Sequence, residues 1–226
     1  MVIEKTHPNP SDPVIVFLDL DKTLVTVNTI GHFVRWLILN GVTPRHLIWR
    51  TFTLLIKTKI SSPSLTDSTK LWLSIFQGWD EAILRNQASA YFCKFLKNKF
   101  RTPLLKVVED HRKLNHHLVL LTGTSSYIAE LVSSHLNLES YYSSRLITQN
   151  GKLTGAVVEP LCLEESKLEY AREACRVLKT NLSNCWFYSD SCFDLPLLNA
   201  VSIPVAVHPD VELRAVAASR NWKIIE

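Results

Sequence analysis

The sequence predicts an α/β fold with a buried parallel sheet, a β-hairpin and an inserted set of helices. Short uninterrupted apolar runs recur at residues 14–18, 118–121, 185–188 and 203–207. Such runs suit strands that are buried on both faces of a parallel sheet. Helical patterns separate the runs, and strands that alternate with helices indicate an α/β architecture.

The composition is that of an ordinary globular chain with no demand for a nucleic-acid partner. Of 226 residues, 46% are hydrophobic and 20% are charged, and the net charge is only +4. The five cysteines include no C-x-x-C pair, which argues against a disulfide framework and against a zinc site. There is no apolar stretch of the ~18 residues that a membrane-spanning helix requires. We therefore expect a cytoplasmic protein, at most peripheral to a membrane.

The first strand, at 14–18, ends in Asp19 and Asp21, and a long helical segment follows it. Residues 30–100 contain no comparable buried strand and are rich in Trp, Leu, Phe and Lys at helical spacing. This pattern predicts a helical cap at 30–100, inserted into a core made of residues 1–29 and 101–226.

The rest of the core shows three further local signals. After the run at 118–121, apolar residues from Ile128 to Leu136 keep helical spacing. Two β-rich segments flank Asn150–Gly151, which predicts a β-hairpin beside the parallel core. Ser166-x-x-Glu169 has the pattern of a capping box and predicts a helix that runs through Leu178.

Polar side chains follow the apolar runs at the point where each predicted strand ends. The carboxyl ends of parallel strands lie at one edge of a sheet, so these residues should converge on one crevice. Lys167 falls in the first turn of its helix, where the helix dipole disfavours a cation, so we expect an anionic neighbour. The residues at the strand ends are Asp19, Asp21, Thr122, Asp190 and Asp194.

These residue types are suited to phosphoryl transfer. Asp19, Asp190 and a backbone carbonyl are hard oxygen ligands of the kind that Mg²⁺ takes, with water and a substrate phosphate completing the octahedron. A carboxylate beside the metal can attack phosphorus and form an aspartyl phosphate. A cation and a phosphate would also explain why two carboxylates are tolerated close together at Asp19 and Asp21.

Four motifs resemble those of the haloacid dehalogenase-like (HAD) superfamily. "DLDKTL" is similar to its D-x-D-x-T signature and "LLTGTS" to its second motif. Lys167 in "EESKLEYA" is similar to the third motif, and "YSDSCFDLPLL" to the fourth. The tail, "SIPVAVHPDVELRAVAASRNWKII", resembles that of the phosphoserine phosphatase-like branch, subfamily IB. The resemblance implies a Rossmann-like core that is completed by a helical cap.

The resemblance also implies a role for each matching residue. Asp19 would be the nucleophile and a Mg²⁺ ligand, and Asp21 the general acid/base that also gives its backbone carbonyl to the metal. Asp190 would ligate the metal, and Asp194 would support it from nearby. The phosphate oxygens would be held by Thr122, Gly123 and Lys167.

Two positions depart from the pattern of the branch. Phosphoserine phosphatases carry a glutamate nine residues beyond the nucleophile, where it meets the amino group of the substrate, and this chain has Asn28 there. Phosphoserine is therefore a less favoured substrate. Phe193 stands where an Asn is common, so one hydrogen-bonding side chain is lost beside the metal-binding residues.

Some of these residues also have purely structural interpretations. Asp194, followed by Leu195 and Pro196, is an ordinary helix start with Asp as the N-cap, a role compatible with one in the site. Thr122-Gly123 could form a simple turn from strand to helix. A catalytically silent phospho-ligand binder is a further alternative, although such a protein would be expected to lack Asp19.

The segment "FVRWLILNGVTPRHLIWRTFTLLIKTKI" leaves two interpretations of the cap open. Its mixture of bulky apolar and basic residues suits helices that bury one face on the core, and we favour this packing. It also suits an amphipathic surface on anionic lipid, as in a bacterial phosphatidylglycerophosphatase of the same branch. The expected function is therefore Mg²⁺-dependent hydrolysis of a small phosphomonoester, with a lipid phosphate as the alternative. The basic residues are Arg35, Arg45, Arg50, Lys57 and Lys59.

Overall fold

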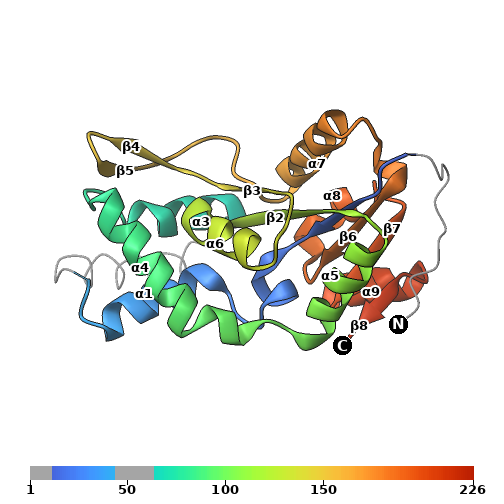
Figure 1. Cartoon of the computed structure of the whole chain (residues 1–226), viewed down its shortest axis with the longest axis horizontal. Helices are drawn as coiled ribbons and strands as arrows, with labels where there is room; N and C mark the ends of the chain where they lie inside the picture. Colours follow the sequence, from blue (N-terminus) through green and yellow to red (C-terminus); the bar gives the residue numbers. More distant parts are fainter. Residues whose placement is uncertain (1–11, 44–63) are drawn as a thin grey trace.

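A six-stranded parallel sheet forms the centre of the molecule (Figure 1). The structure is a computed structural model that describes residues 12–43 and 64–226. The strand order is β3-β2-β1-β6-β7-β8, so the first strand of the sequence lies in the interior of the sheet. The strands are β1 (Ile15–Leu18), β2 (His117–Ser125), β3 (Ser140–Ser144), β6 (Cys185–Ser189), β7 (Ile203–Val207) and β8 (Lys223–Ile225).

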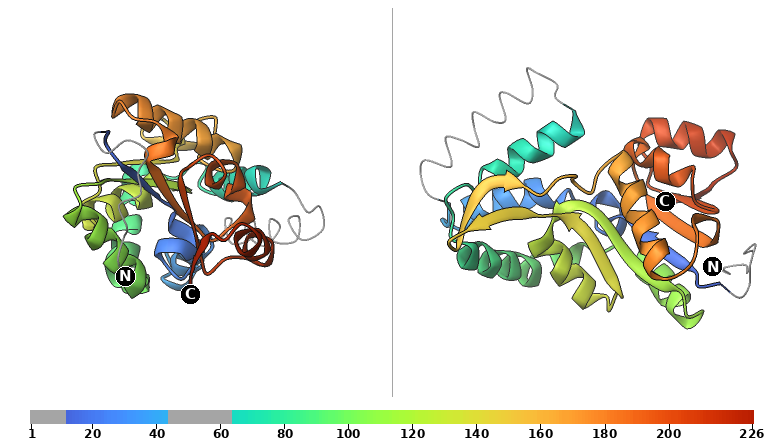
Figure 2. Two further views of the ribbon diagram at one scale, coloured as in Figure 1. Left: turned by 90° about the vertical axis from the view of Figure 1, so that its right-hand side faces the viewer. Right: turned by 90° about the horizontal axis from the view of Figure 1, so that it is seen from above.

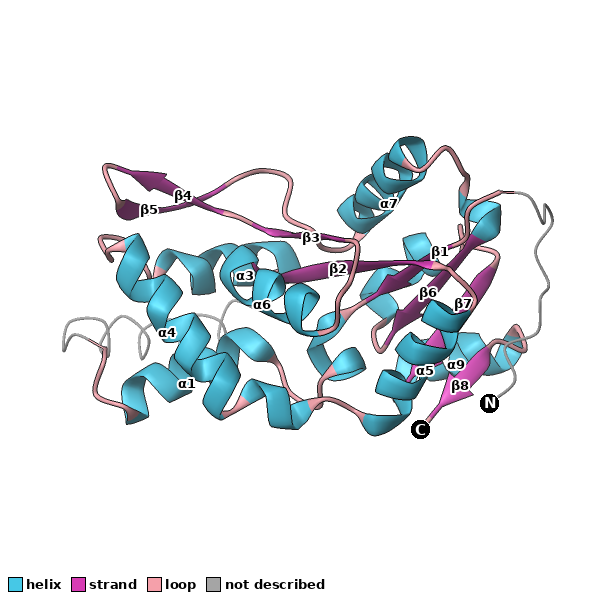
Figure 3. Cartoon of the chain, viewed as in Figure 1, coloured by secondary structure: helices cyan, strands magenta, loops and turns pink. Residues whose placement is uncertain are grey.

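Helices cover both faces of this sheet (Figure 3). Along β1, Val16 and Leu18 pack on the side of α5 and α6, whereas Ile15 and Phe17 pack on the side of α7, α8 and α9. Burial on both faces explains why the strand is apolar throughout. The predicted α/β fold with a Rossmann-like sheet is confirmed. The helices are α5 (Thr102–Lys113), α6 (Ser126–His135), α7 (Glu165–Val177), α8 (Leu195–Leu198) and α9 (Val211–Ser219).

The register of the sheet places the ends of β1 and β6 beside the middle of β2. Leu18, the last residue of β1, lies opposite Leu120 on β2 and Tyr188 on β6. The next residue, Asp19, still donates its backbone N–H to the carbonyl of Tyr188 at 3.0 Å. The residues that follow β1 and β6 therefore come level with the second half of β2, which carries Thr122 and Gly123.

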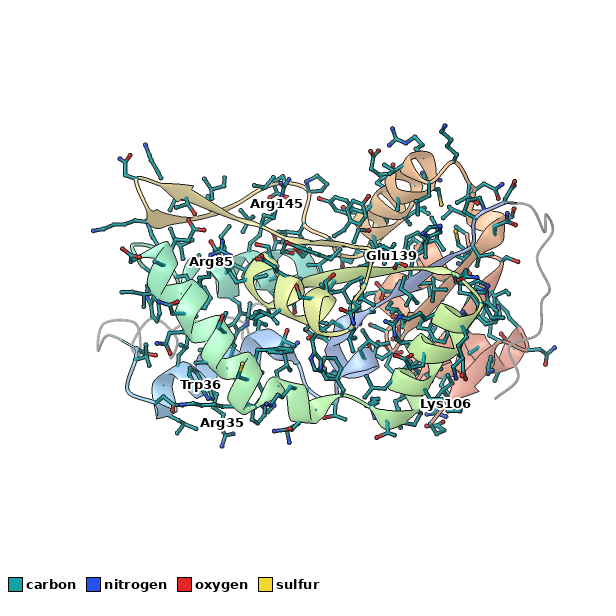
Figure 4. The ribbon with its side chains drawn as sticks, viewed as in Figure 1. Arg35, Trp36, Arg85, Lys106, Glu139 and Arg145 are labelled. Atoms are coloured by element: carbon teal, nitrogen blue, oxygen red, sulfur yellow. The ribbon has the colours of Figure 1, made fainter. Side chains whose placement is uncertain are left out.

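Three helices, here called the outer helices, lie at the end of the molecule away from α8 and α9 (Figure 2). They are α1 (Thr29–Leu39), α3 (Leu65–Ser74) and α4 (Glu81–Lys94), and a short 3-10 helix, Leu96–Lys99, follows them. Arg85 on α4 forms an ion pair with Glu130 on α6 at 3.1 Å, which joins an outer helix to the core (Figure 4). The described part of residues 30–100 is thus mainly helical. The basic residues Arg45, Arg50, Lys57 and Lys59 lie outside the described residues.

The predicted hairpin forms, but its position differs from the prediction. Strands β4 (Leu146–Gln149) and β5 (Lys152–Val157) make a separate antiparallel pair. Gly78 donates its N–H to the carbonyl of Leu153 at 2.7 Å, and Leu153 donates to Trp79 at 2.8 Å. The hairpin therefore lies against the outer helices and not beside the parallel sheet (Figure 1). The Asn-Gly turn specifies a hairpin, but it does not specify which neighbour will satisfy its free edge.

The capping-box prediction for α7 is wrong. The helix begins at Glu165, one residue before Ser166, and its N-cap residue Glu164 makes no side-chain capping bond. Glu164 instead has φ 50° and ψ −131°, a strained backbone for a residue with a side chain. The predicted end is close, because Leu178 is the C-cap residue.

None of the helices in the described residues is both long and apolar enough to cross a membrane.

Candidate active site

The ends of β1, β2 and β6 open into a cavity of about 210 Å³ beneath the outer helices α1 and α3. Backbone geometry places the residues after these strands at one edge of the sheet, and α1 and α3 add Ile30, Leu65 and Thr69 to the opposite wall. All the residues that the sequence suggested for the site line this cavity. They are Asp19, Asp21, Thr122, Gly123, Lys167, Asp190 and Asp194.

Lys167 joins two of the carboxylates at the floor of the cavity. Its Nζ donates to Oδ1 of Asp19 at 2.7 Å and to Oδ2 of Asp194 at 2.8 Å. All three residues are at least 94% buried. These carboxylates are the anionic neighbours expected for a lysine in the first turn of a helix. Asp194 is the N-cap residue of α8, with Pro196 in the first turn as expected, but its side chain makes no capping bond there.

The electrostatics of the floor follow from burial and from an excess of carboxylates. Burial raises the pKa of Asp19 to about 8, although the adjacent Lys167 acts in the opposite direction. Burial, followed by repulsion from Asp194, raises the pKa of Asp190 to about 6. Burial alone would lower the pKa of Lys167, but the Asp19 and Asp194 carboxylates outweigh it and the pKa is raised. Lys167 is thus held as a cation, and one cation does not neutralise this set of carboxylates.

Thr23 connects the carboxylates that follow β1 and β6. The turn at Leu20–Leu24 brings the Thr23 hydroxyl back over the strand end, with Lys22 at φ 57°. The Thr23 Oγ1 lies 3.0 Å from Oδ2 of Asp19 and 3.2 Å from Oδ1 of Asp190. One hydroxyl therefore fixes the spacing of two carboxylates that are far apart in the sequence.

Asp21 lies in a different environment, at the start of α1. The backbone N–H of Thr29 donates to Oδ1 of Asp21 at 3.0 Å, and Thr124 Oγ1 lies 3.4 Å from both carboxylate oxygens. A short hydrogen bond joins the hydroxyls of Thr29 and Thr124. Burial raises the pKa of Asp21, and the bonds from Thr29 oppose that effect. A carboxyl group with a raised pKa is suited to proton transfer.

The end of β2 supplies hydroxyl and backbone groups. The Thr122 side chain is buried, and its Oγ1 accepts the N–H of Thr124 at 3.1 Å. Gly123 lies directly against Leu163, because a Cβ added at Gly123 would be 2.2 Å from Leu163 Cδ2. Thr122-Gly123 is therefore part of the cavity wall and not only a turn between strand and helix.

Several supporting residues carry no sequence motif of their own. Ser189 at the end of β6 donates to Oδ2 of Asp194. Asp210 caps α9 through Leu213 N at 2.7 Å, and its second oxygen accepts Cys192 N at 2.8 Å. Asp210 thereby holds the loop that carries Asp190. An Asp three residues after the run at 203–207 was the available signal for it.

The carboxylates that follow β1 and β6 fit a divalent cation. In the described part of the chain, no group of three or more His, Cys, Asp or Glu side chains forms a metal site by itself. Asp19 and Asp190, aligned by Thr23, offer two carboxylates, and the Asp21 carbonyl is a third candidate ligand. Their pKa values are raised by burial and mutual repulsion, which a divalent cation would relieve.

Comparisons with known proteins agree with this fold. The family model of haloacid dehalogenase-like hydrolases matches residues 16–199. The chain is 25% identical to an "inhibition of morphological differentiation protein" of Streptomyces azureus, with 93% of this chain and 77% of that protein covered. It is 24% identical to a phosphoserine phosphatase of Mycobacterium tuberculosis, with 92% and 69% covered.

Two solved structures share the fold. A Bordetella pertussis protein of unknown function superposes with a TM-score of 0.87 at 20% identity, with 96% of this chain and 99% of that chain covered. A substrate-bound phosphoserine phosphatase superposes with a TM-score of 0.69 at 17% identity, with 96% and 94% covered. At these identities, both matches show a shared fold.

A parallel sheet with carboxylates and a lysine at its carboxyl edge defines a class of α/β hydrolases. The chain belongs to the haloacid dehalogenase-like hydrolase family. Within this family it is a phosphatase.

Proposed function

We propose that the protein hydrolyses phosphomonoesters in a Mg²⁺-dependent reaction through a phosphate ester on Asp19. The observation that supports this most is the pairing of Asp19 with Lys167 at 2.7 Å and with Thr23 at 3.0 Å, at the floor of the cavity. These contacts orient the Asp19 carboxylate beside Asp190, and Lys167 opposes the effect of burial on the pKa of Asp19.

In the first step, a carboxylate oxygen of Asp19 attacks phosphorus, and the bond from phosphorus to the alcohol oxygen breaks. Asp21 gives its proton to that oxygen, so the alcohol leaves as a neutral molecule. Lys167 and the Thr122-Gly123 segment hold the non-bridging oxygens, whose charge they offset. A Mg²⁺ ion held by Asp19, Asp190 and the Asp21 carbonyl would offset the remaining negative charge when bound.

In the second step, Asp21 takes a proton from water as the water oxygen attacks phosphorus. The bond between phosphorus and Asp19 breaks, and inorganic phosphate leaves. One carboxyl group serves as acid and then as base, which the hydrogen bonds from Thr29 and Thr124 support by fixing its position.

The substrate we propose is a small soluble phosphate ester in the cytoplasm, with residues 30–100 as a cap over a core of 1–29 and 101–226. Asn28 lines the cavity, but its Oδ1 already accepts Gly31 N at 3.0 Å as the N-cap of α1. This amide cannot pair with an ammonium group as a carboxylate would. A lipid phosphate stays an alternative. Four of the five basic residues on which this alternative is based lie outside the described residues.

The nucleophile is tested with Asp19→Asn in the metal-loaded protein. Because an amide cannot attack phosphorus as a carboxylate does, we expect turnover of 4-nitrophenyl phosphate to fall by on the order of 10⁴-fold. Asp110→Asn on α5 makes the same chemical change outside the site and should keep wild-type activity. EDTA should abolish wild-type turnover, and Mg²⁺ should restore it. Near-normal rates for pure Asp19→Asn would refute the covalent route, and a wild-type protein inactive on all esters would favour a silent binder.

The acid is tested with Asp21→Asn. The variant keeps the backbone carbonyl, but it loses the carboxyl proton that Asp21 gives to the leaving oxygen. We expect turnover to fall by about 10²–10⁴-fold. The loss should be smaller for an aryl phosphate, whose alcohol leaves without protonation, than for an alkyl phosphate. Equal losses for both esters would remove Asp21 from this role.

A further inference from the structure

The cavity divides into a charged floor and an apolar rim. The buried residues Asp19, Lys167, Asp194 and Thr122 form the floor, as described above. The rim consists of lining residues that are half-buried or exposed and come from four separate elements. Its apolar members are Ile30 on α1, Leu65 on α3, Leu163 before α7 and Phe193 after β6.

Phe193 is the most open of these apolar side chains. It is 50% exposed, although it follows directly on the loop that carries Asp190. An aromatic ring that is left half in water at the mouth of a cavity has apolar surface available for a ligand. Leu163, another apolar member of the rim, is held by close contact with Gly123.

The polar side chains around the rim are engaged with the protein backbone. Thr69 Oγ1 donates to the Leu65 carbonyl at 2.9 Å, and Ser191 Oγ accepts Phe193 N at 3.4 Å. Asn28 Oδ1 caps α1. Lys22 is the one cationic side chain among the described rim residues, and it suits phosphate and not an ammonium group. Two lining carboxylates outside the floor, Asp21 and Asp190, are half-buried, but the proposed mechanism commits Asp190 to the metal and Asp21 to the leaving oxygen.

From this arrangement we infer that the site selects small phosphomonoesters whose alcohol part is uncharged and apolar. The inference rests on the proposed function and names its substrate class. With the phosphate on the floor, the alcohol carbons lie between Ile30, Leu65 and Phe193, where burial of apolar surface is favourable. An ammonium group in the same position would lose water without gaining a partner. The volume of about 210 Å³ limits the enclosed part of the alcohol to a few carbon atoms.

Two isosteric esters test this inference directly. Propyl phosphate and O-phosphoethanolamine differ by a terminal CH₃ in place of NH₃⁺, so they fill the same space. We expect kcat/KM to be at least about tenfold higher for propyl phosphate. The leaving group of phosphoethanolamine is intrinsically the better one, so chemistry alone would favour the opposite order. A ratio of one or below in the wild-type protein would overturn the inference.

A charge placed on the rim should change this preference. Leu65→Glu puts a carboxylate in the first turn of α3, where the helix dipole tolerates it. We expect the propyl-to-ethanolamine ratio to fall by about tenfold. Leu39→Glu is the matched control, because Leu39 on α1 is 73% exposed and does not line the cavity. An unchanged ratio in folded Leu65→Glu would contradict the inference.

Phe193→Glu repeats the test on an exposed side chain, in case Leu65→Glu does not fold. It should lower the same ratio, and failure to do so in a folded variant counts against the inference. 4-Nitrophenyl phosphate with Mg²⁺ is assayed alongside. If the wild-type protein hydrolyses it without preferring propyl phosphate, only the substrate class is wrong. If it hydrolyses no ester, the proposed function fails as well.

Discussion

Thr23 shows how a single hydroxyl can organise a site. It touches Asp19 and Asp190, the two carboxylates proposed for the metal, and is itself fully buried. Loss of a residue that orients metal ligands typically costs about 10–100-fold in metal affinity or activity. The threonine of the "DLDKTL" motif therefore has a positioning role that the two aspartates cannot supply.

Thr23→Val keeps the shape of the side chain and removes this hydroxyl. We expect the concentration of Mg²⁺ needed for half-maximal activity to rise by about 10–100-fold, because Asp19 and Asp190 lose their common partner. Thr26→Val is the matched control, since Thr26 is an exposed residue of the same segment. A Mg²⁺ requirement equal to that of the wild type would exclude this role.

Several site residues could be predicted from the sequence because the topology alone brings them together. Asp19, Thr122 and Asp190 each follow an apolar run, and parallel strands end at one edge. The supporting hydroxyls could not be predicted in this way. Serine and threonine are common, and nothing in the local sequence indicates that Ser189 would face Asp194 or that Thr124 would face Asp21.

At the scale of elements, the hairpin β4–β5 depends on one close approach. Gly155 has φ +83°, and a Cβ there would lie 2.8 Å from Cβ of Gln77, just before the segment that pairs with the hairpin. A glycine is thus required both by the backbone conformation and by the neighbouring chain. The absence of a side chain at Gly155 lets the hairpin approach Gln77 this closely.

Gly155→Ala and Gly151→Ala separate these two requirements. Gly151 has φ +74° but no atom within 4 Å of an added Cβ, so its substitution costs backbone strain alone. We expect Gly155→Ala to lower the free energy of unfolding by about 1–3 kcal/mol more than Gly151→Ala, because the hairpin must move. Urea unfolding of both variants measures this difference, and equal losses would mean that the contact with Gln77 has no cost.

A second pair of contacts attaches α3 to the loop before α7. Thr66 Oγ1 donates to Glu164 Oε2 at 2.7 Å, and Lys70 forms an ion pair with Glu159 at 2.6 Å. Leu65 and Thr69 on the same helix line the cavity, as does Leu163 beside Glu164. Glu164, whose backbone is strained, thus connects α3 to the loop that carries Leu163.

Glu164→Ala and Thr66→Val should each raise KM for a small phosphate ester by about 2–10-fold, since one hydrogen bond that holds α3 is lost. Glu164→Gln and Thr66→Ser keep an acceptor and a donor, so they should restore the wild-type KM. kcat should change less than KM in the impaired variants. Failure of both conservative variants to restore KM would show that the bond is not what matters.

At the scale of the whole molecule, the excess of carboxylates in the cavity predicts that a bound cation stabilises the folded state. Mg²⁺ at about 100 times its dissociation constant would stabilise the folded state by about 2.7 kcal/mol. For a chain of this length we expect the melting temperature to rise by about 5–10 °C. Asp190→Asn should lose most of this rise and Asp110→Asn none of it. A rise of the same size in Asp190→Asn would place the ion elsewhere.

Whether the protein binds membranes is a second question at the scale of the whole molecule. We expect the protein to stay in the supernatant when anionic vesicles are sedimented at low and at high salt. Each basic residue near an anionic surface adds on the order of 1 kcal/mol, so real binding would be sensitive to salt. Salt-sensitive sedimentation that Arg50→Glu and Lys57→Glu abolish would support the lipid alternative.

The strands of the sheet differ in how well the sequence predicts them. The apolar run at 203–207 coincides with β7, Ile203–Val207, because an interior strand has no polar face. The edge strands β3, Ser140–Ser144, and β8, Lys223–Ile225, were not predicted. An edge strand pairs on one side only and is partly exposed, so it lacks a continuous apolar run.

The interior position of β1 also affects how the chain reaches its native state. Ile15 must pair with His117 on one side and with Cys185 on the other. Synthesis proceeds from the N-terminus, so this apolar strand leaves the ribosome long before either neighbour exists. Closing such distant pairs is entropically expensive and slow, and an apolar strand with both edges unpaired favours aggregation meanwhile. We therefore expect nascent chains that end before β6 to need chaperone protection, which release of β6 would relieve.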